Sequence, residues 1–165
     1  MEHSRPQFNN IRLKKILLIS GKEKIKLLKN ITETIPFIDF VGIEFDLREN
    51  ELTARLPFKP TLIGNDMIKA LHGGAIGSFL ESVAIVQLAY HLNLNDYKER
   101  EKDEIQLPKT IDFTIDYILA GMPQTSYAKA KVNRSGKRYA SVSVAAWQSE
   151  KEVPFAQAIG HFLVP

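Results

Sequence analysis

The sequence has 165 residues, 44% of them hydrophobic and 25% charged, a length and composition that suit one soluble domain with a core and not a disordered chain. Its formal net charge of +3 is too small by itself to indicate a nucleic-acid-binding protein. Cysteine is absent, which excludes disulfides, cysteine zinc sites, iron–sulfur clusters and a cysteine nucleophile. Residues 1–10 carry no apolar signal core, and we expect a cytoplasmic protein.

The chain is expected to begin with a basic arm at residues 1–36, followed by the main domain at residues 37–165. The arm contains a stretch, residues 21–35, whose apolar residues recur at helical spacing, with lysines on the other side. These recurring residues are Ile25, Leu28, Ile31 and Thr32. The pattern predicts a short amphipathic helix that ends before Pro36.

Three segments follow the arm. Residues 41–58 hold two short apolar runs divided by Asn50 and its charged neighbours, which predicts a β-hairpin. Residues 60–71 predict an irregular loop. Residues 72–92 are apolar on nearly every side, as a buried helix is. We do not predict a membrane span there, because four polar residues interrupt it and the chain has no second such segment. These four are Ser78, Glu81, Ser82 and Gln87.

After a charged connection at residues 93–108, the last third of the chain predicts strands. Residues 109–119 alternate between apolar and polar side chains, as a strand with one apolar face does. The apolar positions are Ile111, Phe113, Ile115 and Tyr117, and the polar ones are Thr110, Asp112, Thr114 and Asp116. Residues 126–134 and 139–147 alternate too, around a glycine-containing turn, and residues 154–164 close the chain. This order predicts an α+β fold, with one antiparallel sheet wrapped around a single long helix.

Glu81 stands in the middle of the predicted buried helix, between Leu80 and Val83. An isolated buried carboxylate costs several kcal/mol, so such a residue needs a partner, a raised pKa or a wet cavity. The alternative is that Glu81 lies on the one exposed stripe of the helix. The apolar residues around it leave little room for such a stripe, and Glu81 is therefore a candidate catalytic carboxylate.

A second signal, His72-Gly73-Gly74, stands at the start of the same helix. Glycines leave the backbone N–H groups of the first turn, at the positive end of the helix dipole, open to close approach. Such donors suit a developing oxyanion. The alternatives are a tight turn that merely needs glycine, and a histidine that caps or packs.

The spacing of these two signals predicts a dimer. Gly73 and Glu81 are eight residues apart, or about 12 Å along a helix axis, whereas hydrogen-bond reach is about 3 Å. Both groups can therefore act on one carbonyl only if they come from different subunits, which makes an obligate dimer with two equivalent sites.

Three motifs resemble the hotdog-fold acyl-CoA thioesterases of the phenylacetate-pathway (PaaI-like) group. They are NDMIKALHGG at residues 65–74, with Glu81 nine residues after the histidine, TIDFTIDY at 110–117, and RSGKR at 134–138. The resemblance covers residues 37–164. It implies a hotdog fold, subunits that join their sheets into a dimer and often pair again into tetramers, and hydrolysis of an acyl-CoA thioester to a carboxylate and free coenzyme A.

The resemblance also implies roles for five residues. Glu81 takes the place of the catalytic carboxylate, and Gly73 supplies the oxyanion amide from the other subunit. Asn65 and His72 orient the thioester and the helix start, and the Thr110 hydroxyl holds the attacking water. The sequence departs from the group at four positions: Lys69 replaces a common glycine, Asp66 a common proline, Leu119 a common arginine, and Glu81 the more frequent aspartate.

Coenzyme A carries phosphates, and three cations cluster at one predicted turn: Arg134, Lys137 and Arg138. They are candidates to bind the phosphates, and the alternative is a solvated basic turn. Candidates for the acyl pocket are Phe79, Val83 and Tyr117, which suit the core equally well. We expect no cofactor beyond the coenzyme A of the substrate, and no metal, because the four histidines show no ligand spacing.

Two other functions stay open. The first is a non-catalytic acyl-CoA-binding sensor, and the second is a hotdog hydratase or dehydratase, although neither His91 nor His161 is spaced to pair with Glu81. The arm carries eight cations, at positions 5, 12, 14, 15, 22, 24, 26 and 29. It looks too short for a helix-turn-helix, and we expect neither a nucleic-acid nor a membrane partner.

Overall fold

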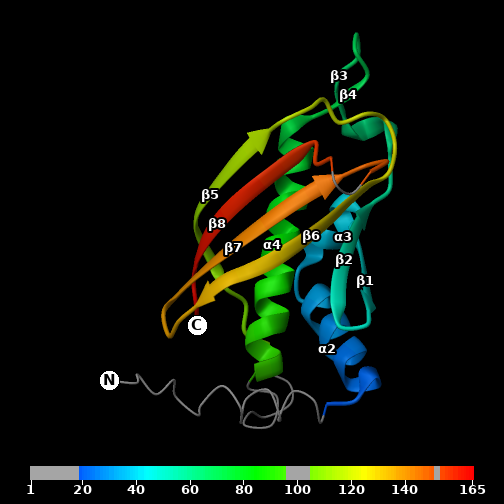
Figure 1. Ribbon diagram of the computed structural model, residues 1–165. Helices are drawn as coiled ribbons and strands as arrows, with labels where there is room; N and C mark the ends of the chain where they lie inside the picture. The colour runs from blue at the N-terminus through cyan, green and yellow to red at the C-terminus, as the bar shows by residue number, and fades with distance from the viewer. Residues whose placement is uncertain (1–18, 96–104, 151–152) are drawn as a thin grey trace.

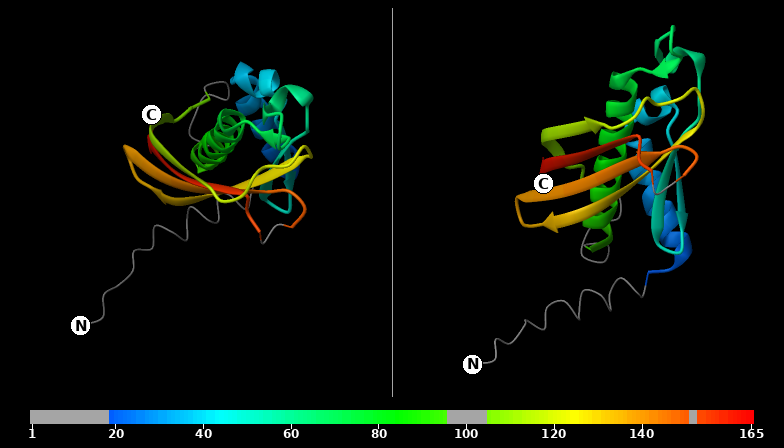
Figure 2. Two further views of the ribbon diagram at one scale, coloured as in Figure 1. Left: turned by 90° about the horizontal axis from the view of Figure 1, so that it is seen from above. Right: turned by 45° about the horizontal axis from the view of Figure 1, so that its top comes forward.

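A computed structural model describes residues 19–95, 105–150 and 153–165. Its main feature is a six-stranded antiparallel sheet, in the order β1-β2-β6-β7-β8-β5, curved around one long helix, α4 (Gly73–Asn95) (Figures 1 and 2). The strands are β1 (Glu44–Arg48), β2 (Glu51–Leu56), β5 (Lys109–Tyr117), β6 (Ser126–Ser135), β7 (Tyr139–Trp147) and β8 (Ala156–Leu163). The predicted fold class, an α+β hotdog, is confirmed.

Helix α4 lies inside the curve of the sheet, where Figure 2 shows it end-on. Phe79, Leu80, Val83 and Val86 are at most 1% exposed, and they form the centre of the core with the inward residues of β6, β7 and β8. This helix is long and apolar enough to cross a membrane by length and composition, and 61% of its most apolar window is buried inside the protein. The prediction that it is apolar on nearly every side needs one correction, because the face toward β5 is only half-buried.

Two helices precede the sheet. Helix α2 (Gly21–Glu33) begins at a capping box, in which Ser20 and Glu23 satisfy each other's backbone N–H groups. The predicted apolar face is wrong at one position: Ile25 is 57% exposed, and Leu27 is buried instead, against α4. Pro36 does more than end this helix, since it is the first residue of α3 (Pro36–Val41), which the sequence analysis did not predict. Proline suits that position because the first helical N–H lacks an internal partner anyway.

The hairpin predicted around Asn50 is confirmed. Strands β1 and β2 pair antiparallel, and the two residues of their turn, Glu49 and Asn50, both have positive φ, +51° and +68°. Two-residue turns of this handedness match the twist of the flanking strands.

The segment before α4 is more regular than the predicted loop. It forms a short 3₁₀ turn, η1 (Pro60–Leu62), and a small hairpin of β3 (Ile63–Asn65) and β4 (Ala70–Leu71). Figures 1 and 2 show this β3–β4 hairpin projecting past the N-terminal end of α4. Periodicity could not predict strands of three and two residues.

Strand β5 is an edge of the sheet and pairs only with β8 among the described strands. Between Thr110 and Asp112 its register shifts, so that two residues of β5 advance against one of β8. Ile111 is therefore the extra residue of a β-bulge. The strict alternation predicted for residues 109–119 is wrong at this point, because Thr110 lies on the helix side of the sheet with Phe113 and not on the outer side with Asp112.

Candidate active site

The chemistry-bearing residues of α4 lie on one stripe that faces β5. Gly73, Gly77 and Glu81 are spaced four residues apart, so they lie on one face of the helix. Three residues of β5 contact this stripe in reverse order: Tyr117 beside Gly73, Ile115 beside Gly77, and Thr110 beside Glu81. We call this contact the α4–β5 seam. It has an amide end at Gly73 and a carboxylate end at Glu81.

At the carboxylate end, the Thr110 hydroxyl donates a hydrogen bond of 2.8 Å to Glu81 Oε1. The two side chains come from segments 29 residues apart, and the bulge at Ile111 turns Thr110 toward the helix. Glu81 is half-buried, so the expectation of a fully enclosed carboxylate is corrected. Of the three features that the sequence argument allowed for such a carboxylate, the seam supplies the first, a hydrogen-bond partner.

At the amide end, hydrogen bonds hold the backbone around the two glycines. His72 Nδ1 accepts from Gly74 N–H at 2.9 Å, and His72 N–H donates to Leu62 O at 2.8 Å. The Tyr117 hydroxyl donates to Gly73 O, also at 2.9 Å. Within the described part of the chain, the N–H of Gly73 has no acceptor, as expected for the first residue of a helix. Gly73 therefore presents a donor at the helix start, and His72 caps the same turn.

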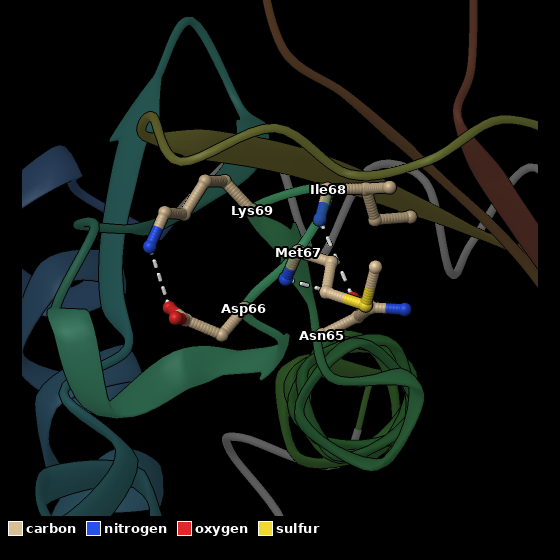
Figure 3. A network of polar contacts seen from close by, with 5 residues as sticks. All are labelled: Asn65, Asp66, Met67, Ile68 and Lys69. Carbon is tan, nitrogen blue, oxygen red and sulfur yellow. Dashed lines mark hydrogen bonds and ion pairs between the residues drawn. The ribbon is translucent and has the colours of Figure 1, made fainter.

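Asn65 is not brought to this turn by any hydrogen bond among the described residues. Its Oδ1 accepts from Met67 N–H at 3.1 Å and from Ile68 N–H at 3.3 Å, which closes the tip of the β3–β4 hairpin (Figure 3). Lys69, in the place of a common glycine, adopts a positive φ of +52°, and its Nζ lies 2.6 Å from Asp66 Oδ1. The residues of this motif thus shape the hairpin that leads into α4.

Sequence reasoning missed one residue of the amide end. A Cβ atom on Gly64 would lie 2.5 Å from His72 Cα and 2.7 Å from its Cβ, so position 64 is glycine because the His72 backbone lies directly against it. No sequence signal singled it out, since glycines in predicted loops are common. Tyr117 was considered only as a pocket residue, whereas its hydroxyl is bonded to Gly73 O at the helix start.

The three cations proposed for phosphate binding lie together near the carboxylate end. Arg134 is on β6, and Lys137 and Arg138 are in the turn between β6 and β7. All three are exposed and form no ion pair within the described residues. Tyr139, the first residue of β7, pairs with Leu163 of β8, and Leu163 pairs with Lys109, the first residue of β5. The basic turn therefore lies at the end of the sheet where β5 begins (Figure 1).

The remaining candidates lie elsewhere. Phe79 and Val83 are fully buried core residues. His161 Nδ1 lies 3.3 Å from Asp112 Oδ2 on the outer face of the sheet, and His91 contacts Asn95 near the end of α4. Neither histidine is hydrogen-bonded to Glu81. Among the described residues, no group of three His, Asp or Glu side chains is placed to hold a metal ion.

A sheet curved around one long helix is the hotdog arrangement, and the seam carries a carboxylate and a free helix-start amide. The sequence matches the family model of the thioesterase superfamily over residues 69–155, more than half of the chain. The chain belongs to this superfamily and is a thioester hydrolase.

Individual relatives agree with this assignment. The medium/long-chain acyl-CoA thioesterase YigI of Escherichia coli K12 is 28% identical over 154 residues, 89% of this chain and 97% of YigI. A crystal structure of a Chromobacterium violaceum protein is 32% identical, covers 96% of both chains and has a TM-score of 0.60. A Bacillus halodurans protein solved with CoA has a TM-score of 0.64 at 20% identity, over 99% of this chain and 97% of that one.

Proposed function

We propose that this protein hydrolyses acyl-CoA thioesters to a carboxylate and free coenzyme A. The observation that carries the proposal is the seam itself, where Glu81, bonded to Thr110, shares one helix face with the Gly73 amide. Two comparisons support the substrate class. YigI is a medium/long-chain acyl-CoA thioesterase, and the Bacillus halodurans neighbour was solved with CoA.

The complete site in this proposal is built from two subunits. The free edge of β5 can pair antiparallel with β5 of a second copy. If this pair is centred on Thr114, the bulge at Ile111 places Thr110 opposite the partner's Tyr117, both on the helix side of the sheet. The carboxylate end of one seam then meets the amide end of the other, which removes the separation of about 12 Å between Gly73 and Glu81 in one chain. A two-fold axis gives two such sites.

The chemistry follows from the donors and acceptors at the two ends. The thioester carbonyl oxygen accepts from Gly73 N–H, where the helix dipole favours negative charge. In one route Glu81 removes a proton from water as the water oxygen attacks the carbonyl carbon. Collapse of the tetrahedral oxyanion then expels the coenzyme A thiolate, which takes up that proton. In the other route a Glu81 oxygen attacks the carbonyl carbon, the C–S bond breaks and the coenzyme A thiolate leaves, and water then hydrolyses the resulting anhydride to the acid and free Glu81.

Thr110 suits the first route. Its hydroxyl has one donor and two acceptor positions, and the donor is used on Glu81. The hydroxyl oxygen can therefore still accept a hydrogen bond from one hydrogen of a water molecule, while the Glu81 carboxylate accepts the other hydrogen of the same water. In a single turnover in ¹⁸O-labelled water, unlabelled acid with label in Glu81 identifies the nucleophilic route. The general-base route labels the product acid and leaves Glu81 unlabelled, as does an anhydride that water attacks at the acyl carbon.

The test of the function is Glu81→Gln, assayed on short, medium, long and aromatic CoA thioesters with detection of free thiol. This variant keeps the shape of the side chain and removes the base, and we expect kcat to fall by about 10²–10⁴-fold. Asp116→Asn, on the outer face of β5, is the matched control and should retain activity. Unchanged turnover in Glu81→Gln would refute the assignment, and acyl-CoA binding without thiol release by the unaltered protein would favour a sensor.

The phosphates of coenzyme A are proposed to bind Arg134, Lys137 and Arg138. These three cations form no ion pair with the residues that the structure describes. Their turn lies at the same end of the sheet as the carboxylate end of the seam. Replacing Lys137 and Arg138 by alanine should weaken turnover of a CoA thioester more than that of its pantetheine analogue. Equal loss on both substrates would leave the turn without a role in phosphate binding.

The proposal includes a cytoplasmic dimer that needs no cofactor, since coenzyme A is part of the substrate. Asn65 retains a proposed orienting role through the hairpin that it closes. Light scattering on the active protein should give a dimer or a dimer of dimers. A fully active monomer is incompatible with a shared site, and loss of activity after dialysis that added metal restores would contradict the absence of a cofactor.

A further inference from the structure

The turn that carries the proposed oxyanion donor has an intrinsically loose backbone. Gly73 and Gly74 follow each other at the start of α4, and glycine has the largest backbone freedom of all residues. An oxyanion donor works only if it is already aimed before the reaction. Other parts of the molecule must therefore hold these two peptide groups in place.

Two of the contacts that do so are local to the hairpin and the helix start. The ring of His72 caps Gly74 N–H, and the backbone of His72 is bonded to Leu62. The third comes from a distant segment: the hydroxyl of Tyr117, the last residue of β5, donates to Gly73 O across 44 residues of sequence. Among the hydrogen bonds of the described residues, it is the one that joins the turn to the main sheet.

We propose that Tyr117 is a positioning residue for the oxyanion turn. This inference rests on the proposed function, because it gives Tyr117 a purpose only if Gly73 receives the thioester oxygen. Gly73 O belongs to the peptide group between Gly73 and Gly74, and the free Gly73 N–H belongs to the preceding peptide group, which is joined to it at Gly73 Cα. A hydrogen bond on Gly73 O restricts rotation about the two backbone bonds of Gly73, and with it the direction of the free N–H.

The surroundings of Tyr117 fit this role. Its ring atoms lie 3.5 Å from the position of a Cβ on Gly73, and its hydroxyl lies 3.6 Å from that of a Cβ on Gly77. The tyrosine thus lies over the glycine part of the stripe in ordinary contact distance. Its hydroxyl hydrogen is engaged by Gly73 O, so Tyr117 holds the turn and does not protonate the leaving thiolate.

The dimer proposed above places this residue in the composite site. Tyr117 then lies opposite Thr110 of the partner subunit. In each composite site, Tyr117 of one subunit holds the amide end, and Thr110 of the partner subunit supports the carboxylate end. A change at Tyr117 should therefore affect the transition state, where charge collects on the oxygen, more than it affects substrate binding.

The test compares Tyr117→Phe with the unaltered protein on medium- and long-chain acyl-CoA. We expect kcat to fall about 3- to 10-fold, the worth of one neutral hydrogen bond, with KM changed less than about twofold. Hydrogen exchange of the peptide that covers residues 72–77 should become faster. Tyr139→Phe, another half-exposed tyrosine at the end of a strand, is the control and should change neither quantity.

The outcomes separate the inference from the function on which it rests. Normal kcat and normal exchange in Tyr117→Phe overturn the inference, as does a raised KM with unchanged kcat, which would mean a substrate contact. Tyr117→Leu removes the ring as well, so impairment in this variant alone would assign the effect to packing and overturn the inference too. Absence of thioesterase activity in the unaltered protein refutes the proposed function instead, and exchange still shows whether the hydroxyl holds the turn.

Discussion

The two ends of the α4–β5 seam are held in place in different ways. At the amide end, hydrogen bonds from the η1 turn, the His72 ring and Tyr117 converge on the backbone of one helical turn. At the carboxylate end, a single hydrogen bond joins two side chains, Thr110 and Glu81. The amide end depends on the tertiary arrangement of several segments, and the carboxylate end depends on a one-residue bulge in β5.

This difference follows from what each end supplies. A backbone N–H cannot be chosen by residue type, so its direction must be set by the segments around it. A carboxylate is chosen by residue type, and one partner suffices to orient it. Substitutions at the carboxylate end should therefore act on catalysis alone, whereas substitutions at the amide end should act on catalysis and on stability together.

After Glu81→Gln, the largest effect is expected at the carboxylate end, from Thr110→Ala. The variant removes the hydrogen bond to Glu81 Oε1, and a hydrogen bond to a charged group is worth about 1.5–3 kcal/mol. We therefore expect kcat to fall by about 10- to 100-fold, with little change in the thermal midpoint because Thr110 is exposed. Thr110→Ser keeps the hydroxyl and should retain most of the activity. Equal losses in both variants would show that the methyl group matters and not the hydroxyl.

The next effect is expected at the amide end, from Gly64→Ala. The new Cβ would meet the His72 backbone at 2.5 Å, and overpacking of this kind costs about 1–3 kcal/mol. Urea unfolding should show this loss of stability. The thioesterase assay should show a lower kcat, because His72 caps the turn that carries the proposed oxyanion donor. Gly21→Ala, with no atom within 4 Å of the new Cβ, is the control and should not reduce stability. A fall in kcat without a loss of stability would contradict the proposed difference between the two ends.

The fold was predictable from the sequence because its main elements are long and periodic. Nine residues of β5 and twenty-three of α4 give enough repeats for a period of two or of 3.6 to stand out. The β3–β4 hairpin and α3 are too short for that, and the burial of Leu27 instead of Ile25 depends on how α2 meets α4. The rotation of a helix against its neighbour is a tertiary property that spacing alone does not determine.

The candidate site was predictable to a similar extent. Glu81 was conspicuous as a charge among apolar residues, and the pair of glycines at Gly73 indicated an open helix start. Thr110 came only from the resemblance, since strict alternation would have placed it on the outer face of the sheet. Gly64 and the hydroxyl of Tyr117 act through contacts between segments far apart in sequence, and single-residue patterns carry no sign of such contacts.

The smallest effect is expected from Tyr90→Phe, farther along α4. The hydroxyl of Tyr90 is a buried polar group without a hydrogen-bond partner among the described residues, in contrast to Glu81, which has Thr110. Burial raises the pKa of Tyr90 to about 12. Tyr90→Phe should therefore raise the free energy of unfolding by about 1 kcal/mol at neutral pH, because it removes an unsatisfied buried hydroxyl.

The advantage of Tyr90→Phe should grow as the pH rises from about 10 to 12, since in that range the tyrosine ionises in the unfolded chain but stays neutral in the folded protein. Urea unfolding at pH 7 and near pH 11 measures both effects. Tyr127→Phe, in which the tyrosine is only partly buried, is the control and should show a smaller gain. A loss of stability in Tyr90→Phe would mean that the hydroxyl has a partner, as Glu81 has.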